Sequence, residues 1–304
     1  MTPRISLAAI RRYLTRLRER YSGSLKMLDN PTSQIPSHRA KGQGDQALTV
    51  RHCKPRVLMA SSVHPWNDVR VYFKMARSIA SFAHVRLIAV QAPGSSTPPD
   101  GRICIDLLPA NGLRPGDRKS IIFRLKRIGM ILKSVLLQKY DVFHFHDPEL
   151  LPAGWLAKLR GKKVIYDIHE DNPSYILEKY WITKLLRMPV SRVFSFVENT
   201  VAQQLNFLLT AGPLLKERFE KINPKTEVIH NFPLSVEFVT RTKWDEKQNE
   251  VCFIGGITRI RGLMEVLQAL EKVNSVTLNL VGSYSSIEFR EELRGYQGWE
   301  KVSV

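Results

Sequence analysis

Short apolar runs alternate with longer amphipathic stretches from Arg56 to the end of the chain. The short runs predict buried strands, and apolar residues that recur every three or four positions predict helices. Strands are predicted at 57–60, 85–90, 103–107, 141–145, 164–168, 208–211 and 227–230, and helices near 68–82, 120–138, 149–160, 174–186, 190–205 and 213–221. This alternation is typical of an α/β fold in which helices cover both faces of a mostly parallel, Rossmann-like sheet.

The same pattern starts again after a polar break at 231–233 and a polar run at 241–250. Strands are predicted at 251–254, 276–281 and 302–304, with helices at 262–272 and 286–294. A complete doubly wound domain has about five or six strands. We therefore expect one complete Rossmann-like domain at 55–234 and a partial second one at 235–304, with an unpaired strand edge.

Residues 1–54 form a basic arm and a polar linker before the first strand. Within 5–21, apolar side chains such as Ile10, Leu14 and Leu17 recur at helical spacing, and arginines occupy the other side. Three interpretations fit this basic amphipathic helix: an anchor on an anionic membrane surface, a helix docked on its own domain, or a mitochondrial presequence.

Charge and cysteine content narrow the class of protein. Lys and Arg outnumber Asp and Glu by 46 to 28, a net charge of +18, which favours phosphate-rich partners. Nucleic acid is not expected among them, because the chain has no recognised binding module and no interleaving of basic and aromatic residues. The three cysteines are far apart and predict neither a disulfide framework nor a zinc site. The cysteine content fits a reducing cytoplasm, and no apolar run is long enough to cross a bilayer. We therefore expect a cytoplasmic protein, which lies on the inner face of the membrane if the segment at 5–21 is an anchor.

Two polar clusters follow predicted strands, where open α/β sheets bind their ligands. In the cluster at 64–70, Asp68 is suited either to cap the next helix or to contact a ligand. In the cluster at 144–149, His144 and His146 share a strand face, but a metal would need further ligands, and we expect none. Asp147 is expected to cap the following helix, with His146 at the border of the cleft.

A third cluster, at 166–172, places His169 among several carboxylates directly after a strand. Neighbouring carboxylates favour a charged imidazole, which could hold a phosphate oxygen or a substrate hydroxyl. The alternative is a polar loop that caps the next helix. In the second half of the chain, 255–262 combines paired glycines, a helix N-terminus, Arg259 and Arg261, features that attract a diphosphate.

The cluster at 146–149, the segment at 164–170, the residues at 228–231 and the loop at 255–262 together resemble the group 1 (family 4) glycosyltransferases. The resemblance runs from about Arg56 to the end, and the order and spacing of the motifs carry it. It implies a GT-B fold, with two Rossmann-like domains on either side of a cleft. The N-terminal domain would bind a glycan or lipid-linked acceptor, and the C-terminal domain the nucleotide-sugar donor.

The resemblance also implies roles for individual residues. His169 matches the family's active-site histidine, near the donor sugar and the leaving phosphates. Arg261 stands where the family usually has a diphosphate-binding lysine, and Arg259 is our substitute for the basic contact that Gly256 replaces. The donor diphosphate site is thus predicted to contain Gly255, Gly256, Arg259 and Arg261, and the acceptor-side cleft Asp68, Arg70, His146, Asp147 and Glu170.

The implied reaction is sugar transfer with retention of configuration, in polysaccharide or glycoconjugate biosynthesis, without a metal or other cofactor. Two departures from the family qualify it. Trp66 and its neighbours replace paired glycines in the N-terminal loop, and the glutamate pair that holds the donor sugar and ribose is expected beyond residue 304. The alternative is therefore a non-catalytic remnant or subunit whose donor site needs a partner chain.

Overall fold

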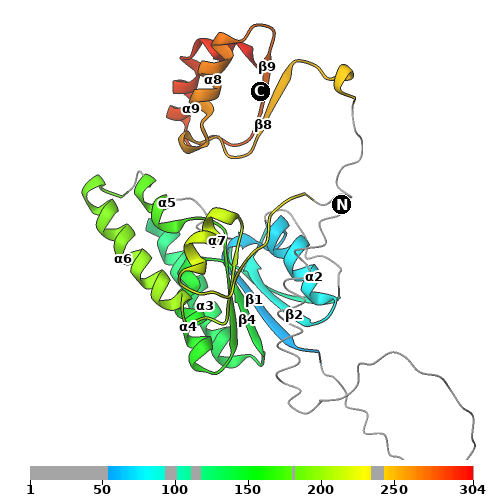
Figure 1. Ribbon diagram of the computed structural model, residues 1–304, viewed down its shortest axis with the longest axis vertical. Coiled ribbons are helices and arrows are strands. Elements are labelled where there is room, and N and C mark those ends of the chain that lie inside the picture. Colours follow the sequence, from blue (N-terminus) through cyan, green and yellow to red (C-terminus); the bar gives the residue numbers. More distant parts are fainter. Residues whose placement is uncertain (1–53, 93–100, 111–117, 180–181, 234–242, 304) are drawn as a thin grey trace, which may run out of the picture. The chain divides into compact units, whose positions relative to one another are not determined.

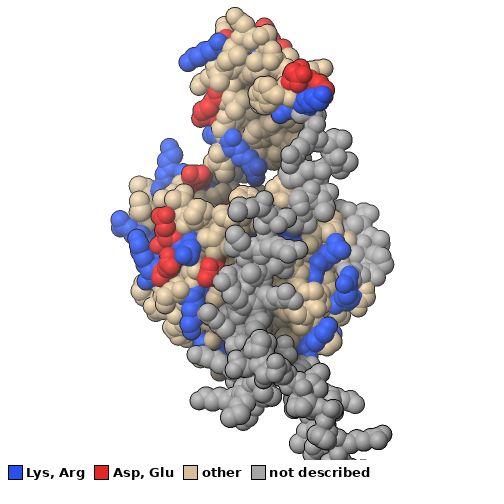
Figure 2. All heavy atoms as spheres, turned by 45° about the vertical axis from the view of Figure 1, so that its right-hand side comes forward, with Lys and Arg blue, Asp and Glu red and all other residues tan. Residues whose placement is uncertain are grey.

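The computed structural model describes residues 54–92, 101–110, 118–179, 182–233 and 243–303. They belong to two compact units, Met1–Asn231 and Phe232–Val304, and we describe each unit by itself (Figure 1). The basic amphipathic helix predicted at 5–21 lies outside the described residues. Basic side chains are spread over the visible surface of the first unit (Figure 2).

The first unit is built on a seven-stranded parallel sheet of order β3-β2-β1-β4-β5-β6-β7. The strands are β1 (Arg56–Pro65), β2 (His84–Val90), β3 (Ile103–Leu108), β4 (Val142–Phe145), β5 (Lys163–Ile168), β6 (Phe207–Thr210) and β7 (Thr226–Val228). The order reverses between β1 and β4, which is the switch point where such sheets form a crevice at the carboxyl ends of their strands.

Helices cover both faces of this sheet (Figure 1). They are η1 (Val69–Ala76), α2 (Arg77–Ala80), α3 (Arg118–Leu137), η2 (Pro148–Leu150), α4 (Leu151–Leu159), α5 (Asn172–Glu178), α6 (Lys184–Ala202) and α7 (Pro213–Glu220). In the described part of the chain, no helix is both long and apolar enough to span a bilayer.

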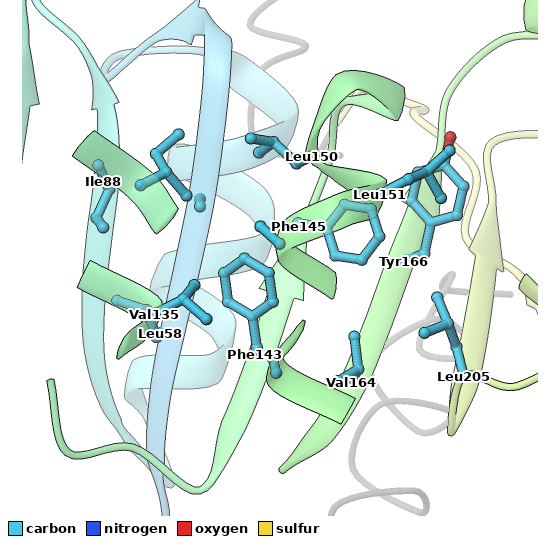
Figure 3. Close-up of a cluster of buried hydrophobic side chains, with 14 of the residues drawn as sticks. Leu58, Ile88, Val135, Phe143, Phe145, Leu150, Leu151, Val164, Tyr166 and Leu205 are labelled. Atoms are coloured by element: carbon cyan, nitrogen blue, oxygen red, sulfur yellow. The ribbon is translucent and has the colours of Figure 1, made fainter. Parts of the chain in front are cut away.

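Two hydrophobic layers hold the unit together because successive side chains of a strand point to opposite faces. Val57 and Met59 of β1 face η1 and α2, whereas Leu58 packs with Phe143 and Phe145 under α3 and α4 (Figure 3). The helix α4 approaches this second layer closely at Gly154, where a Cβ atom would lie 2.5 Å from the Phe145 ring. A larger residue would therefore push the helix off the sheet.

One predicted helix boundary is wrong. The pattern predicted helices at 174–186 and 190–205, separated before Pro189, but Pro189 lies inside α6 and the break comes between Glu178 and Lys184. Pro189 has no backbone N–H to donate to the carbonyl of Leu185, and because residue Leu185 is 85% exposed, this part of the helix is in contact with water and the loss is tolerated. The side chain of Arg187 donates to the carbonyls of Ile182 and Leu177 and so closes the actual break.

The second unit contains a three-stranded parallel sheet of order β10-β9-β8. Its elements are η4 (Trp244–Glu246), β8 (Glu250–Ile254), η5 (Arg259–Arg261), α8 (Leu263–Lys272), β9 (Thr277–Val281), α9 (Ile287–Arg294), η6 (Gln297–Lys301) and β10 (Val302–Ser303). Leu263 and Leu267 of α8 pack with Leu278 and Leu280 of β9 in a core of their own. Within this sheet β8 is an end strand, and its Ile254 side chain is exposed.

Candidate active site

The three polar clusters of the first unit meet at the carboxyl ends of β1, β4 and β5. The Cα pairing of β1 with β4 ends at Ala60 and Phe145, and beyond this point the chains carry polar side chains. The ring of His169 lies 5.2 Å from that of His64 and 5.5 Å from that of His146, measured between centroids. His64 lies at the end of β1, and His146 and His169 directly follow β4 and β5, so the sheet brings together residues that are far apart in sequence.

Asp167 is the buried centre of this arrangement. Its carboxylate accepts two hydrogen bonds from the Arg70 guanidinium, at 2.7 and 3.1 Å, and lies 3.1 Å from His146 Nδ1 and 3.2 Å from His169 Nε2. Arg70 also donates to the carbonyl of Ile229, at 2.7 Å. Burial raises the pKa of Asp167, but the charges of Arg70 and His169 and the imidazole hydrogen bonds hold it well below its usual value. Asp167 is therefore ionised, and its charge is compensated inside the protein.

Two buried histidines lie beside Asp167. The rings of His144 and His146 are 4.6 Å apart, and burial lowers the pKa of both, so both are neutral near pH 7. Together with Asp167 they offer three ligand atoms within 4.8 Å of one another, a geometry that could hold a metal ion. The guanidinium of Arg70 already contacts both oxygens of Asp167 and supplies the positive charge of this cluster.

A second buried carboxylate, Asp147, lies on the β1 side of the cluster. It accepts hydrogen bonds from the Ser61 hydroxyl at 2.8 Å and from the Ser62 amide at 2.6 Å, and it lies 3.1 Å from His64 Nδ1. Burial lowers the pKa of His64, but the hydrogen bond and charge of Asp147 outweigh it and raise the pKa above its usual value. A positive charge is thus favoured on His64, next to His169.

In the second unit, the loop after β8 allows a close approach of the backbone. Gly255 and Gly282 have φ values of 140° and 156°, and a Cβ atom at Gly282 would lie only 1.8 Å from the Gly255 carbonyl oxygen. The Arg261 guanidinium lies against Gly255, and Gly262, at φ 72°, starts α8. The loop thus combines an exposed backbone, a guanidinium and a helix N-terminus, all of which attract anions.

The comparisons with known proteins agree with this architecture. Residues 69–232, more than half of the chain, match the model of Glycosyltransferase Family 4. The chain belongs to this family. The predicted family, the GT-B fold and the class of enzyme, a glycosyltransferase, are therefore confirmed. No curated protein matches the sequence of this glycosyltransferase.

Two solved structures similar to this glycosyltransferase show the same fold. One is sucrose-phosphate synthase from Thermosynechococcus elongatus, with a TM-score of 0.58 and 13% identity over 82% of this chain and 69% of that one. Another is α,α-trehalose 6-phosphate synthase from Burkholderia multivorans, with a TM-score of 0.52 and 11% identity over 83% of this chain and 72% of that one. At such low identities, the likeness shows the fold alone.

The glycosyltransferase places its predicted acceptor-side residues at different depths. Asp68 caps η1, since its carboxylate accepts from the amides of Arg70 and Val71 at 2.9 and 2.8 Å. Arg70 and His146, expected at the surface of the cleft, are instead buried, because Asp167 draws both side chains inward. Glu170 is exposed beside His169.

The expected cap at Asp147 is a further correction. Its side chain makes no capping hydrogen bond, because Ser61 and Ser62, more than 80 positions earlier, provide donors that turn the carboxylate toward β1. In the donor loop, Arg259 forms an ion pair with Glu292 of α9 and lies over the Phe289 ring. A diphosphate would have to compete with Glu292 for Arg259, whereas Arg261 lies against Gly255 at the loop itself.

The sequence analysis did not predict a second group of polar contacts, centred on Glu198 and Arg218, which we call the clamp and which holds the other side of the His169 loop. Glu198, buried in α6, accepts from the Tyr166 hydroxyl at 3.1 Å, from the Asn172 amide at 3.3 Å and from Arg218 at 2.8 Å. Arg218 also pairs with Asp171. Asp167 therefore holds the loop at its start, and this clamp holds it at its end. The signal available in the sequence was the single acid of a helix whose other charged residues are all basic.

Proposed function

We propose that this glycosyltransferase moves a sugar from a nucleotide-sugar donor to a glycan or lipid-linked acceptor, with retention of anomeric configuration, in polysaccharide or glycoconjugate biosynthesis. The observation that carries the proposal is the orientation of His169, whose Nε2 is directed to the ionised Asp167. If Nε2–H donates to Asp167, then Nδ1 is the nitrogen left for a hydroxyl of the sugar or an oxygen of the phosphates.

The donor loop supports the same reaction. When the bond between the sugar and the diphosphate breaks, negative charge develops on the departing phosphate oxygen. Arg261, the backbone at Gly255 and the N-terminus of α8 would stabilise that charge without reorganising. The leaving diphosphate then takes the proton of the acceptor hydroxyl as this oxygen bonds to the anomeric carbon from the same face. No metal enters this scheme.

We carry retention over from a protein of the same fold as part of this proposal. The chain shares its fold, with a TM-score of 0.50 and 12% identity, with a trehalose-6-phosphate synthase studied for glycosyl transfer with retention. In the first unit, the pairing of Asp147 with His64 favours a positive charge on the His64 imidazole, next to His169. A positive charge at this point would attract the phosphates of a donor.

The test is release of nucleoside diphosphate from a panel of UDP- and GDP-sugars in the presence of glycan and lipid-linked acceptors. We expect His169→Ala and Arg261→Ala to lower kcat/KM by about 10²-fold or more. His84→Ala and Arg294→Ala serve as matched controls, since His84 lies on β2 and Arg294 pairs with Glu291 on α9. The anomeric configuration of the product, read by NMR, tests retention.

A chain that binds neither UDP nor GDP, and none of their sugars, would contradict the proposal. Binding of an acceptor without any turnover would favour the alternative of a non-catalytic subunit.

A further inference from the structure

The outer face of α3, α4 and α6 carries large apolar side chains that the first unit does not cover. These helices lie side by side on one face of the sheet, because α4 contacts both α3 and α6 (Figure 1). Their inward side chains, such as Ile131 and Phe194, pack on the sheet. Their outward side chains include Leu137, Leu185 and Phe196, which are 70%, 85% and 73% exposed.

The charges on this face are of one sign. The three helices contain ten Lys or Arg residues, among which Arg127 is buried and Lys126, Lys133, Lys184 and Arg192 are exposed. Their single acid, Glu198, is buried and paired with Arg218. Glu149, which precedes α4, is paired with Arg124. By contrast, α7, α8 and α9 each contain at least two glutamates. Depletion of acids is therefore not common to all helices of the protein, although η1 and α2 on the other face of the sheet, which carry exposed Val69 and Phe73, also lack acids.

This combination selects one kind of partner. Transfer of the exposed leucine and phenylalanine side chains out of water is favourable, and the exposed lysines and arginines are stabilised by negative charge nearby. A second copy of the same face would bring like charges together, which opposes self-association. Phosphates alone would leave the apolar side chains in water. A bilayer with anionic headgroups satisfies both requirements, because its acyl boundary takes the apolar groups and its headgroups the cations.

We propose that the α3–α4–α6 face binds the surface of an anionic lipid bilayer. Phe196 and Leu185 of α6, with Leu137 of α3, insert at the boundary between headgroups and acyl chains, and Lys126, Lys133 and Arg192 contact the headgroups. The proposal goes beyond the reaction itself and does not depend on which sugar or acceptor is used. It assigns a membrane contact to the folded unit, independently of the segment at 5–21.

The experiment is flotation of the full chain with vesicles of phosphatidylcholine, alone or mixed with phosphatidylglycerol. The test variant is Leu185→Glu/Phe196→Glu, and Ile287→Glu on α9 is the matched control, because Ile287 is also exposed but lies in the second unit. All three side chains are exposed, so the fold is expected to survive, and thermal melting checks this.

We expect the wild type and Ile287→Glu to float with anionic vesicles but not with phosphatidylcholine alone. The double variant should lose about tenfold or more in partitioning. Equal flotation of the double variant would place the contact elsewhere and overturn the proposal, as would absence of binding by the wild type. A wild-type dimer that the double variant converts to monomers, seen by analytical ultracentrifugation without lipid, would assign the face to a second copy instead.

Discussion

Replacing Asp167 with asparagine tests whether the buried ion pair holds the site together. Arg70 and Asp167 are both almost completely buried, and the change leaves the guanidinium without its counter-charge. Removing one partner of a buried pair costs about 3–5 kcal/mol, which is a large part of the roughly 5–15 kcal/mol that stabilises a typical domain. Urea unfolding of Asp167→Asn should therefore show a loss of that size in the free energy of unfolding.

The double variant Arg70→Met/Asp167→Asn separates the charge from the shape of the site. It removes the uncompensated guanidinium. The carbonyl of Ile229 then loses its hydrogen-bond donor, which lowers the free energy of unfolding by about 1–3 kcal/mol. The double variant should thus be more stable than the single one, although inactive if His169 has lost its orientation. A loss below about 1 kcal/mol for Asp167→Asn, or no recovery in the double variant, would refute the reasoning.

Three further changes test other parts of the molecule. His144→Leu should make the protein less sensitive to acid. Because the pKa of His144 is lowered in the folded state, the unfolded chain takes up this proton first, and the free energy of unfolding falls as the pH drops below about 6.5. The difference between the melting temperatures at pH 5 and pH 8 should therefore be smaller in the variant. Gly282→Ala should weaken binding of UDP or GDP, measured by calorimetry, because a Cβ atom 1.8 Å from the Gly255 carbonyl must displace the loop; unchanged binding would mean that the loop does not contact the nucleotide. Glu198→Gln should lower kcat about tenfold or more with little change in KM, since it loosens the end of the His169 loop, and equal effects on both constants would argue against a positioning role.

Much of the fold follows from local pattern. The strand predicted at 164–168 is found at Lys163–Ile168, because a short run of apolar residues buried on both faces has few other ways to fold. The cap at Asp68 also follows from local sequence, since the amides that donate to its carboxylate lie only two and three residues away. The continuation of α6 through Pro189 was not predictable, because it depends on how exposed the residue four positions earlier, Leu185, is in the folded protein.

The candidate site could be predicted only in outline. The sequence placed His169 and its neighbours at a strand end, but the partners that define the site come from far away in the chain. Arg70 is 97 positions from Asp167, and Ser61 is 86 positions from Asp147. Nothing local distinguishes a carboxylate that will cap a helix from one that a distant hydroxyl will capture. The ion pair between Arg259 and Glu292 likewise joins residues that are 33 positions apart, so local sequence does not predict it.

The two holds on the His169 loop come from opposite sides of one strand. Asp167 at the start of the loop is tied to Arg70 of η1, whereas Asn172 at its end is tied to Glu198 of α6, and these two helices cover opposite faces of the sheet. The loop therefore keeps its position only while both layers are intact. Loss of turnover on warming should consequently begin no later than the melting of the less stable of the two layers.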